Sequence, residues 1–182
     1  MAKQSGKSFR SLLGVEPSKP TTKDSVLVIV DAQNEYDHGL LAISNIKPSR
    51  AVIGDLLKKY RKDDGDVVHV HHSTPAGAPL FTPATELAEE FEEFTIGAGE
   101  SEKVVLKQHP SCFTGTDLGE HLDKVGKKKI VLAGYMAHVC ISNTSRAGAE
   151  LGYEVSVVSD GIGDRDIPGA SAKQLVDSPN HA

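Results

Sequence analysis

The chain has 182 residues, which is enough for one domain with a substantial hydrophobic core. Its formal net charge of −5 gives no general attraction for phosphate backbones or anionic lipid, and no apolar run approaches the length of a spanning helix. We therefore expect neither a nucleic-acid partner nor a membrane partner.

Two cysteines make no disulfide framework, and the N-terminal region lacks the apolar core of a classical signal peptide. We expect a cytoplasmic location on these grounds, with export by a non-classical route left open.

The first third of the chain predicts an arm, a buried strand and a long helix. Residues 1–24 form the arm, and residues 25–182 form a single domain. The run Ser25–Val30 has no polar alternation, which is typical of a central parallel strand covered on both faces. An irregular loop follows over 32–45. Helical spacing of apolar residues then starts near Pro48 and continues to the stop at Asp63, Asp64 and Gly65.

The middle of the chain predicts two more strands. Asp66–His72 is the second strand, and a loop over 73–85 leads to a short acidic helix, Glu86–Phe94, with a solvated face. Lys103–Lys107 is the third strand. A helix that contains Leu118, Leu122 and Val125 and stops at Gly126 follows it.

The last third predicts a fourth strand at Ile130–Ala133, a turn that opens at Gly134 and a helix that begins close to Cys140. Glu154–Ser159 is the fifth strand, and a last helix begins near Ser171. Five alternations of strand and helix predict a three-layer α/β/α domain with a doubly wound, mainly parallel, Rossmann-like sheet of five to six strands.

Three reactive side chains fall at the carboxyl ends of strands, where ligands bind in open α/β sheets. These are Asp31, Lys107 and Cys140. Each also has a purely structural interpretation. Asp31 could cap a loop, Lys107 could be a solvated strand end, and Cys140 could be a small buried apolar residue. Packing does not require an acid, a cation and a thiol at neighbouring strand ends, so their convergence indicates catalysis. The position of Cys140 near a helix start also predicts that the thiolate is favoured.

Three segments resemble the signature segments of the isochorismatase-like cysteine hydrolases, in the same order and spacing: residues 28–36, 106–118 and 132–146. The resemblance implies the α/β/α fold and a catalytic triad of Cys140, Asp31 and Lys107. It also implies a cis peptide bond before Met136, with the backbone N–H groups of Met136 and Cys140 as an oxyanion hole.

The resemblance further implies a substrate pocket lined by Gln33, Asn34, Tyr36, Phe113 and Tyr135. The chain departs from the commonest family pattern before the cysteine, where Ala137 and His138 stand. We favour a substrate-binding role for His138 over a solvent-exposed one. Cys112, at a position where the family has a small residue, is expected to fill space near the pocket wall.

The histidines of the second strand are a candidate metal site. His69 and His71 share one face of that strand, but no carboxylate or cysteine is spaced with them as a further ligand. The segment also lacks the metal motif of the nicotinamidase branch. We expect His69, His71 and His72 to be structural or to support the catalytic residues, and we expect no metal, no cofactor and metal-independent activity.

Two reactions fit these residues. In the first, Asp31 protonates the vinyl ether of isochorismate, water captures the cation, and 2,3-dihydro-2,3-dihydroxybenzoate and pyruvate form. In the second, an amidase reaction of the nicotinamidase kind, Cys140 forms a thioester after losing its proton to Asp31. The whole-chain resemblance favours isochorismate, while the intact cysteine favours the amide.

A third possibility is a non-catalytic binding or assembly module with an idle triad. For the enzyme, the expected partners are a small-molecule substrate and further copies of the chain in a homo-oligomer.

Overall fold

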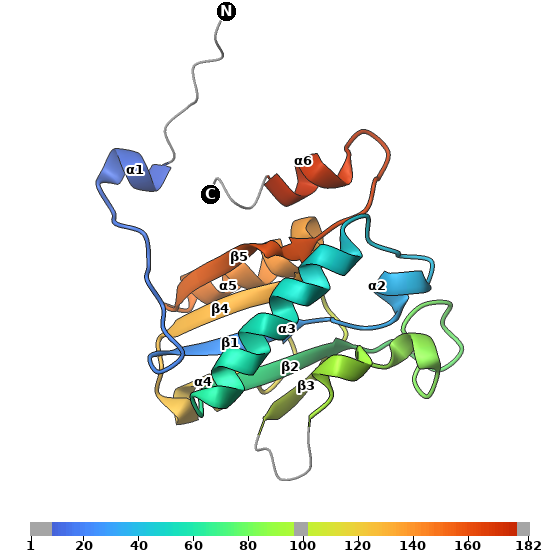
Figure 1. The fold of residues 1–182 in the computed structure, drawn as a ribbon, viewed down its shortest axis with the longest axis horizontal. Helices are drawn as coiled ribbons and strands as arrows, with labels where there is room; N and C mark the ends of the chain where they lie inside the picture. The colour runs from blue at the N-terminus through green and yellow to red at the C-terminus, as the bar shows by residue number, and fades with distance from the viewer. Residues whose placement is uncertain (1–8, 97–101, 178–182) are drawn as a thin grey trace, which may run out of the picture.

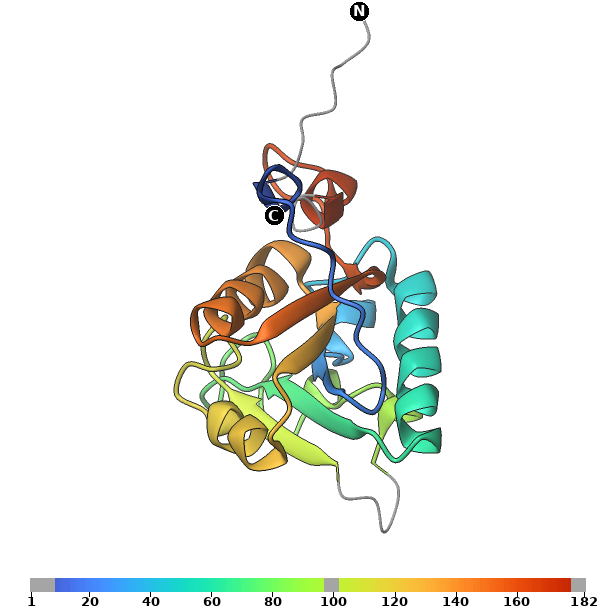
Figure 2. The ribbon, with the colours of Figure 1, turned by 90° about the vertical axis from the view of Figure 1, so that its left-hand side faces the viewer.

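The computed structural model describes residues 9–96 and 102–177 of the chain, and its centre is a single five-stranded parallel sheet. The strand order is β3-β2-β1-β4-β5. The strand bounds are β1 (Ser25–Val30), β2 (Asp66–His72), β3 (Lys103–Lys107), β4 (Lys129–Tyr135) and β5 (Glu154–Gly163). Helices cover both faces of this sheet (Figures 1 and 2). The predicted α/β/α fold is confirmed, with five strands.

Strand β1 is buried at every residue because helices cover the sheet on both sides. Its alternate side chains enter two different clusters, with Val28 in one and Ile29 in the other. The cluster around Val28 includes residues from α4 (Leu118–Val125), with α5 (Ser142–Glu150) on the same face. The cluster around Ile29 includes residues from α3 (Ile46–Lys62). An uninterrupted apolar run is therefore what this position requires.

Strand β4 runs through Gly134, where a turn was expected, and ends at Tyr135. Three further features differ from the sequence-based expectation. Strand β5 extends to Gly163, past a register shift against β4. The chain after β4 forms a π-helical turn, η3 (Ala137–Ile141), and only then the helix α5, which starts at Ser142. A one-turn helix, α2 (Glu35–His38), lies in the segment expected to be irregular. The first two differences affect the residues around Cys140.

The expected acidic helix at Glu86–Phe94 is wrong. The segment forms two short 3-10 turns, η1 (Glu86–Ala88) and η2 (Glu92–Phe94), separated by extended chain. There Glu90 forms an isolated antiparallel bridge with Gln33, and the amide of Phe91 donates to the carbonyl of Ala32. These backbone bonds to the loop after β1 replace the bonds that a continuous helix would make. The expected end of that helix, 97–100, falls outside the described residues.

The short helices α1 (Phe9–Leu13) and α6 (Ala172–Asp177) lie at the same end of the molecule in both views (Figures 1 and 2). Helix α6 begins beside Ser171, as the sequence predicts. The boundary between an arm at 1–24 and a domain at 25–182 stays a prediction. In the described part of the chain, a search for helices with the length and hydropathy of a membrane span finds none.

Candidate active site

Asp31 is the first residue after β1, and the fold places its carboxylate at the carboxyl end of the sheet. Its amide donates to the carbonyl of Val70 at 2.7 Å, which continues the pairing of β1 with β2 for one residue. Its backbone then turns with φ 51°, a left-handed conformation that aspartate adopts more easily than most residues. The side chain is therefore held by a fixed backbone and is completely buried.

Lys107 brings the three predicted strand-end residues together. Its Nζ atom lies 2.7 Å from Oδ2 of Asp31 and donates to Sγ of Cys140 at 3.3 Å. Lys107 and Cys140 are 1% and 5% exposed, so the cluster is almost fully shielded from water. Oδ1 of Asp31 accepts no hydrogen bond from residues 9–96 or 102–177. A buried carboxylate oxygen in this condition is available to a substrate or a water molecule.

The protonation states follow from burial and from the neighbouring charges. Burial is the largest single effect and lowers the pKa of Lys107, but the charge of Asp31, its hydrogen bond to the ammonium group and the neighbouring cysteines together outweigh it. The pKa is therefore raised, and the side chain remains a cation. Burial raises the pKa of the Cys140 thiol strongly, the charge of Asp31 raises it further, and Lys107 only partly opposes this. The expectation that a helix start favours the thiolate is therefore wrong for the resting protein. Cys140 lies inside the π-helical turn, before α5 begins, and its sulfur is buried.

His72 is also a member of this cluster, and from the sequence it was grouped with the structural or supporting histidines of the second strand without a named partner. It is paired in register with Lys107 across β2 and β3, and its Nδ1 atom accepts a hydrogen bond from Nζ of Lys107 at 3.0 Å. Burial and the adjacent lysine lower the pKa of His72, which keeps the ring neutral and able to accept. The available signal was its place at the end of the second strand, the same criterion that selected Lys107.

His138 has a partner that was also missed. Its ring Nδ1 and its backbone N–H both lie within hydrogen-bond distance of Oδ2 of Asp164, at 2.6 and 3.0 Å. Asp164 is fully buried and directly follows β5, whereas the His138 side chain is partly exposed. Reactive side chains were sought directly after each predicted strand. Because β5 was expected to end at Ser159, Asp164 was not among the residues considered.

Of the predicted pocket residues, Tyr36 lies nearest the electrostatic centre of the site. Burial raises the pKa of its hydroxyl well above the ordinary value, and the charge of Asp31 adds to the effect. The hydroxyl therefore remains a neutral hydrogen-bond donor. Its ring contacts the rings of Phe81 and Tyr135, at centroid distances of 5.3 and 5.6 Å.

Gln33 and Asn34 are committed to backbone contacts. The Gln33 amide donates to the carbonyls of His72 and Ala88 and accepts from the His72 N–H. The Asn34 amide donates to the carbonyl of Glu86 at 3.0 Å. These bonds fix the loop after β1 against η1, and direct substrate contact by either side chain stays a prediction.

Tyr135 and Phe113 both make packing contacts, Tyr135 in the buried core and Phe113 as a partly buried side chain. Tyr135 is fully buried, and its hydroxyl pairs with that of Ser49 on α3 at 2.8 Å. Phe113 stacks on Tyr153, which precedes β5 and so marks the amino ends of the strands. A substrate-binding role for these two rings stays a prediction.

The turn before Cys140 has the backbone geometry that the resemblance implies, because the peptide bond between Tyr135 and Met136 is cis. The oxyanion hole at Met136 and Cys140 stays a prediction. Cys112 is a fully buried side chain, and burial raises the pKa of its thiol to about 12. Its backbone N–H donates to the Thr144 hydroxyl, so it fills space as expected.

The metal expectation needs a correction at His69 and His71. The structure adds Glu90 to this pair, and the ligand atoms of the three residues lie within 4.8 Å of one another. Sequence spacing did not reveal the carboxylate, because the loop that carries it folds back over β2. Of these residues, His71 and Glu90 border a hollow of about 820 Å³ whose lining does not include Asp31, Lys107 or Cys140.

Comparisons with known proteins agree with this architecture. The isochorismatase domain family matches residues 25–175. The chain is 60% identical over 169 residues to the secreted isochorismatase effector Isc1 of Verticillium dahliae. The aligned region covers 93% of this chain and 88% of the relative.

Two solved structures extend the comparison. An isochorismatase from Pseudomonas putida superimposes with a TM-score of 0.88 at 28% identity, covering 95% of this chain and 90% of the other. An N-carbamoylsarcosine amidase from Thermoplasma acidophilum superimposes with a TM-score of 0.72 at 27% identity, covering 80% and 87%.

The first of these relatives contradicts the expected cytoplasmic location. A relative that shares 60% of its residues with this chain is named as a secreted protein. The expectation rested on the missing signal-peptide core, which is informative only about classical export.

Proposed function

The chain belongs to the isochorismatase family of hydrolases, and from this premise we propose that it hydrolyses isochorismate at the cluster of Asp31, Lys107 and Cys140. Enzymes of this family act on small molecules. The observation that carries the choice of substrate is the 60% identity to a relative named as an isochorismatase. The buried pair of Asp31 and Lys107 supplies the acid-base group and the cation that this reaction needs.

In the proposed reaction the Asp31 carboxylate first takes up a proton from water, and this acid form then transfers the proton to the methylene carbon of the vinyl ether. The resulting oxocarbenium ion is captured by water, which returns a proton to the Asp31 carboxylate. The hemiketal then transfers its hydroxyl proton to the ether oxygen that is attached to the carbocyclic ring. At the same time the bond between this oxygen and the former vinyl carbon breaks. This releases pyruvate and 2,3-dihydro-2,3-dihydroxybenzoate, and the sulfur of Cys140 forms no bond in this route.

Lys107 has two roles in this proposal. Its cation at 2.7 Å orients the Asp31 carboxylate, and it supplies positive charge in a region closed to water. His72 accepts from the same ammonium group at 3.0 Å and so holds it between the two strands.

Amide hydrolysis is the second candidate, favoured by the protonation state of Cys140. The raised pKa of the buried thiol keeps its proton in place, beside a carboxylate that can remove it when an acyl group arrives. The sulfur then attacks the carbonyl, the amine leaves with a proton from Asp31, and water hydrolyses the thioester. The similarity to an N-carbamoylsarcosine amidase supports this alternative.

The test incubates the purified protein with isochorismate and, separately, with primary amides such as nicotinamide. Pyruvate is followed through lactate dehydrogenase and ammonia through glutamate dehydrogenase. We expect pyruvate in stoichiometric amounts from isochorismate. Release of ammonia from an amide, with isochorismate left intact, would contradict the first proposal and establish the second.

We also propose that the protein is exported, since its relative from Verticillium dahliae is named as a secreted effector. A C-terminally tagged chain expressed in its source organism should accumulate in the culture filtrate, while an intracellular marker protein stays in the cell extract. Retention of the tagged chain with that marker would contradict export.

A further inference from the structure

We propose that His69, His71 and Glu90 form a binding site for a transition-metal dication of the Zn²⁺ class. The site lies on the opposite face of β2 from His72 and Lys107, because side chains on a strand alternate between its two faces. The inference is therefore independent of the proposed reaction.

The ligand set and its spacing carry the proposal. The His69 ring nitrogen Nδ1 lies 2.7 Å from Oε1 of Glu90, and Nε2 of His71 lies 3.4 Å from the same oxygen. Bonds of about 2.0–2.1 Å in a tetrahedral zinc site separate neighbouring ligand atoms by roughly 3.3 Å. The His71 contact already has this spacing, and the His69 contact reaches it when the carboxylate shifts by about 0.6 Å. Water would complete the fourth position.

His71 provides an independent indication of a missing ligand. Its Nε2 atom is shielded from solvent and makes no good hydrogen bond with the described part of the chain. The contact to Glu90 at 3.4 Å is too long for one. Buried polar atoms are nearly always satisfied, and a metal ion between this nitrogen and the carboxylate would satisfy both.

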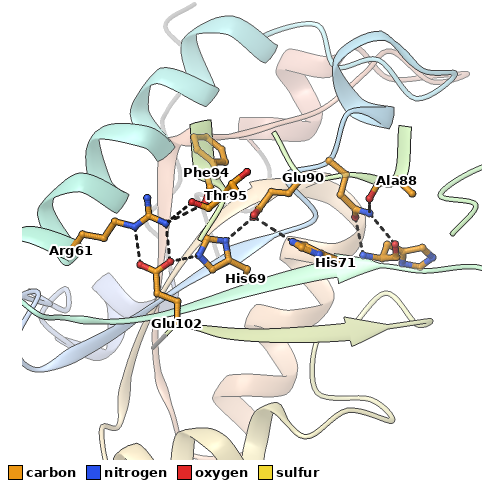
Figure 3. A network of polar contacts seen from close by, with 10 residues as sticks. Arg61, His69, His71, Ala88, Glu90, Phe94, Thr95 and Glu102 are labelled. Atoms are coloured by element: carbon orange, nitrogen blue, oxygen red, sulfur yellow. Dashed lines mark hydrogen bonds and ion pairs between the residues drawn. The ribbon is translucent and has the colours of Figure 1, made fainter. Parts of the chain in front are cut away.

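The surroundings of His69 match the outer shell of known metal sites. Its second nitrogen, Nε2, lies 2.9 Å from Oε2 of Glu102, and Arg61 pairs with the same carboxylate at 2.8 Å (Figure 3). With its proton on Nε2, His69 donates to Glu102 and presents the lone pair of Nδ1 to the ion. A carboxylate that orients a ligating histidine in this way is the usual second partner in zinc sites.

Charge and access favour a cation. Glu90 and Glu102 place two negative charges beside the site, and Arg61 offsets only one of them. The hollow of about 820 Å³ that reaches His71 and Glu90 is also lined by Arg50 and by a larger number of carboxylates: Asp37, Glu86, Glu89, Glu92 and Glu93. Arg50 pairs with Asp37 and Glu93, which leaves the lining with an excess of negative charge. Two imidazoles with one carboxylate select zinc-like ions over Mg²⁺ and Ca²⁺, which prefer oxygen ligands alone. Because His69 and His71 are on β2 and Glu90 is on the loop over it, the ion would fasten that loop to the sheet.

The test is equilibrium dialysis of the full chain against ZnCl₂ after removal of metal with a chelator, with bound zinc measured by mass spectrometry. We expect one equivalent of zinc per wild-type chain and at least a tenfold weaker affinity in His71→Ala and in Glu90→Gln. Affinity should be unchanged in His121→Ala, which removes an imidazole from α4 on the other face of the sheet. Circular dichroism establishes that each variant is folded, and His71→Gln serves as the conservative replacement.

Co²⁺ provides a second readout, since an ion held by two imidazoles and a carboxylate gives visible absorption bands that His71→Ala should lose. Equal zinc affinity in wild type, His71→Ala and Glu90→Gln would overturn the proposal, as would the absence of stoichiometric binding by the wild type. Zinc uptake lost in Cys140→Ser but retained in His71→Ala would overturn it as well, because the thiol would then be the ligand.

Discussion

At the scale of single residues, Cys140 shows how burial and charge oppose a local rule. A thiol near a helix start is expected to ionise easily. Here the sulfur is 5% exposed and lies beside the Asp31 carboxylate, and both factors raise the pKa of the thiol. Lys107 opposes them from 3.3 Å without reversing the result. The resting protein therefore holds a protonated sulfur.

This state predicts slow alkylation. In a Cys112→Ser background, we expect iodoacetamide to label Cys140 more slowly than free N-acetylcysteine at pH 7.5, and faster as the pH rises toward the raised pKa. Asp31→Asn removes a negative charge that raises the pKa, so labelling at a given pH should accelerate. Mass spectrometry gives the rates. Labelling faster than the free thiol in the parent, or slower in Asp31→Asn, would show that the protonation state is wrong.

At the scale of secondary-structure elements, Gly134 shows why β4 can pack against β1 directly beneath the site. Its φ is 120°, and a Cβ atom there would lie 2.0 Å from the carbonyl oxygen of Val30. That atom belongs to backbone one residue before Asp31, so it cannot move without disturbing the site. The sequence marked Gly134 as the start of a turn but could not reveal this contact across strands.

Gly134→Ala should therefore destabilise the protein by about 3 kcal/mol or more, within the range reserved for severe packing defects. The matched control is Gly119→Ala in α4, where a Cβ atom meets nothing within 4 Å. That change should stabilise the protein by about 0.5–1 kcal/mol through helix propensity. Urea midpoints of the two variants give the comparison. Small changes of equal size in the urea midpoints of both variants would contradict the close approach of Gly134 to the Val30 carbonyl.

At the scale of the whole molecule, the fold was predictable because its signals are local. Apolar runs gave β1, β2 and β3 with their correct bounds, and Leu118, Leu122 and Gly126 gave α4. The strand-end rule then placed Asp31, Lys107 and Cys140 together. Contacts between distant segments were not predictable, since neither the pairing of Glu90 with His69 nor that of Asp164 with His138 has a signal in sequence spacing.

The predicted homo-oligomer also belongs to this scale. The edge strand β3 exposes Leu106 at 65% and Val104 at 40%, and an edge strand with apolar side chains favours association. We expect light scattering after size exclusion to give a multiple of the 19.4 kDa chain mass. A single species at the chain mass across the concentrations tested would contradict this prediction.

The central claim is that Asp31 is the acid-base group of a hydrolase, whichever bond is cleaved. It is tested most directly by kcat/KM of wild type, Asp31→Asn and Cys140→Ala on the substrate that the pyruvate and ammonia assays identify. Loss of a positioned acid-base group predicts a decrease of roughly 10²–10⁴-fold in Asp31→Asn. Cys140→Ala should retain activity on isochorismate and lose it on an amide. Activity of folded Asp31→Asn within about tenfold of wild type would contradict the account, since general acid-base catalysis contributes more than that.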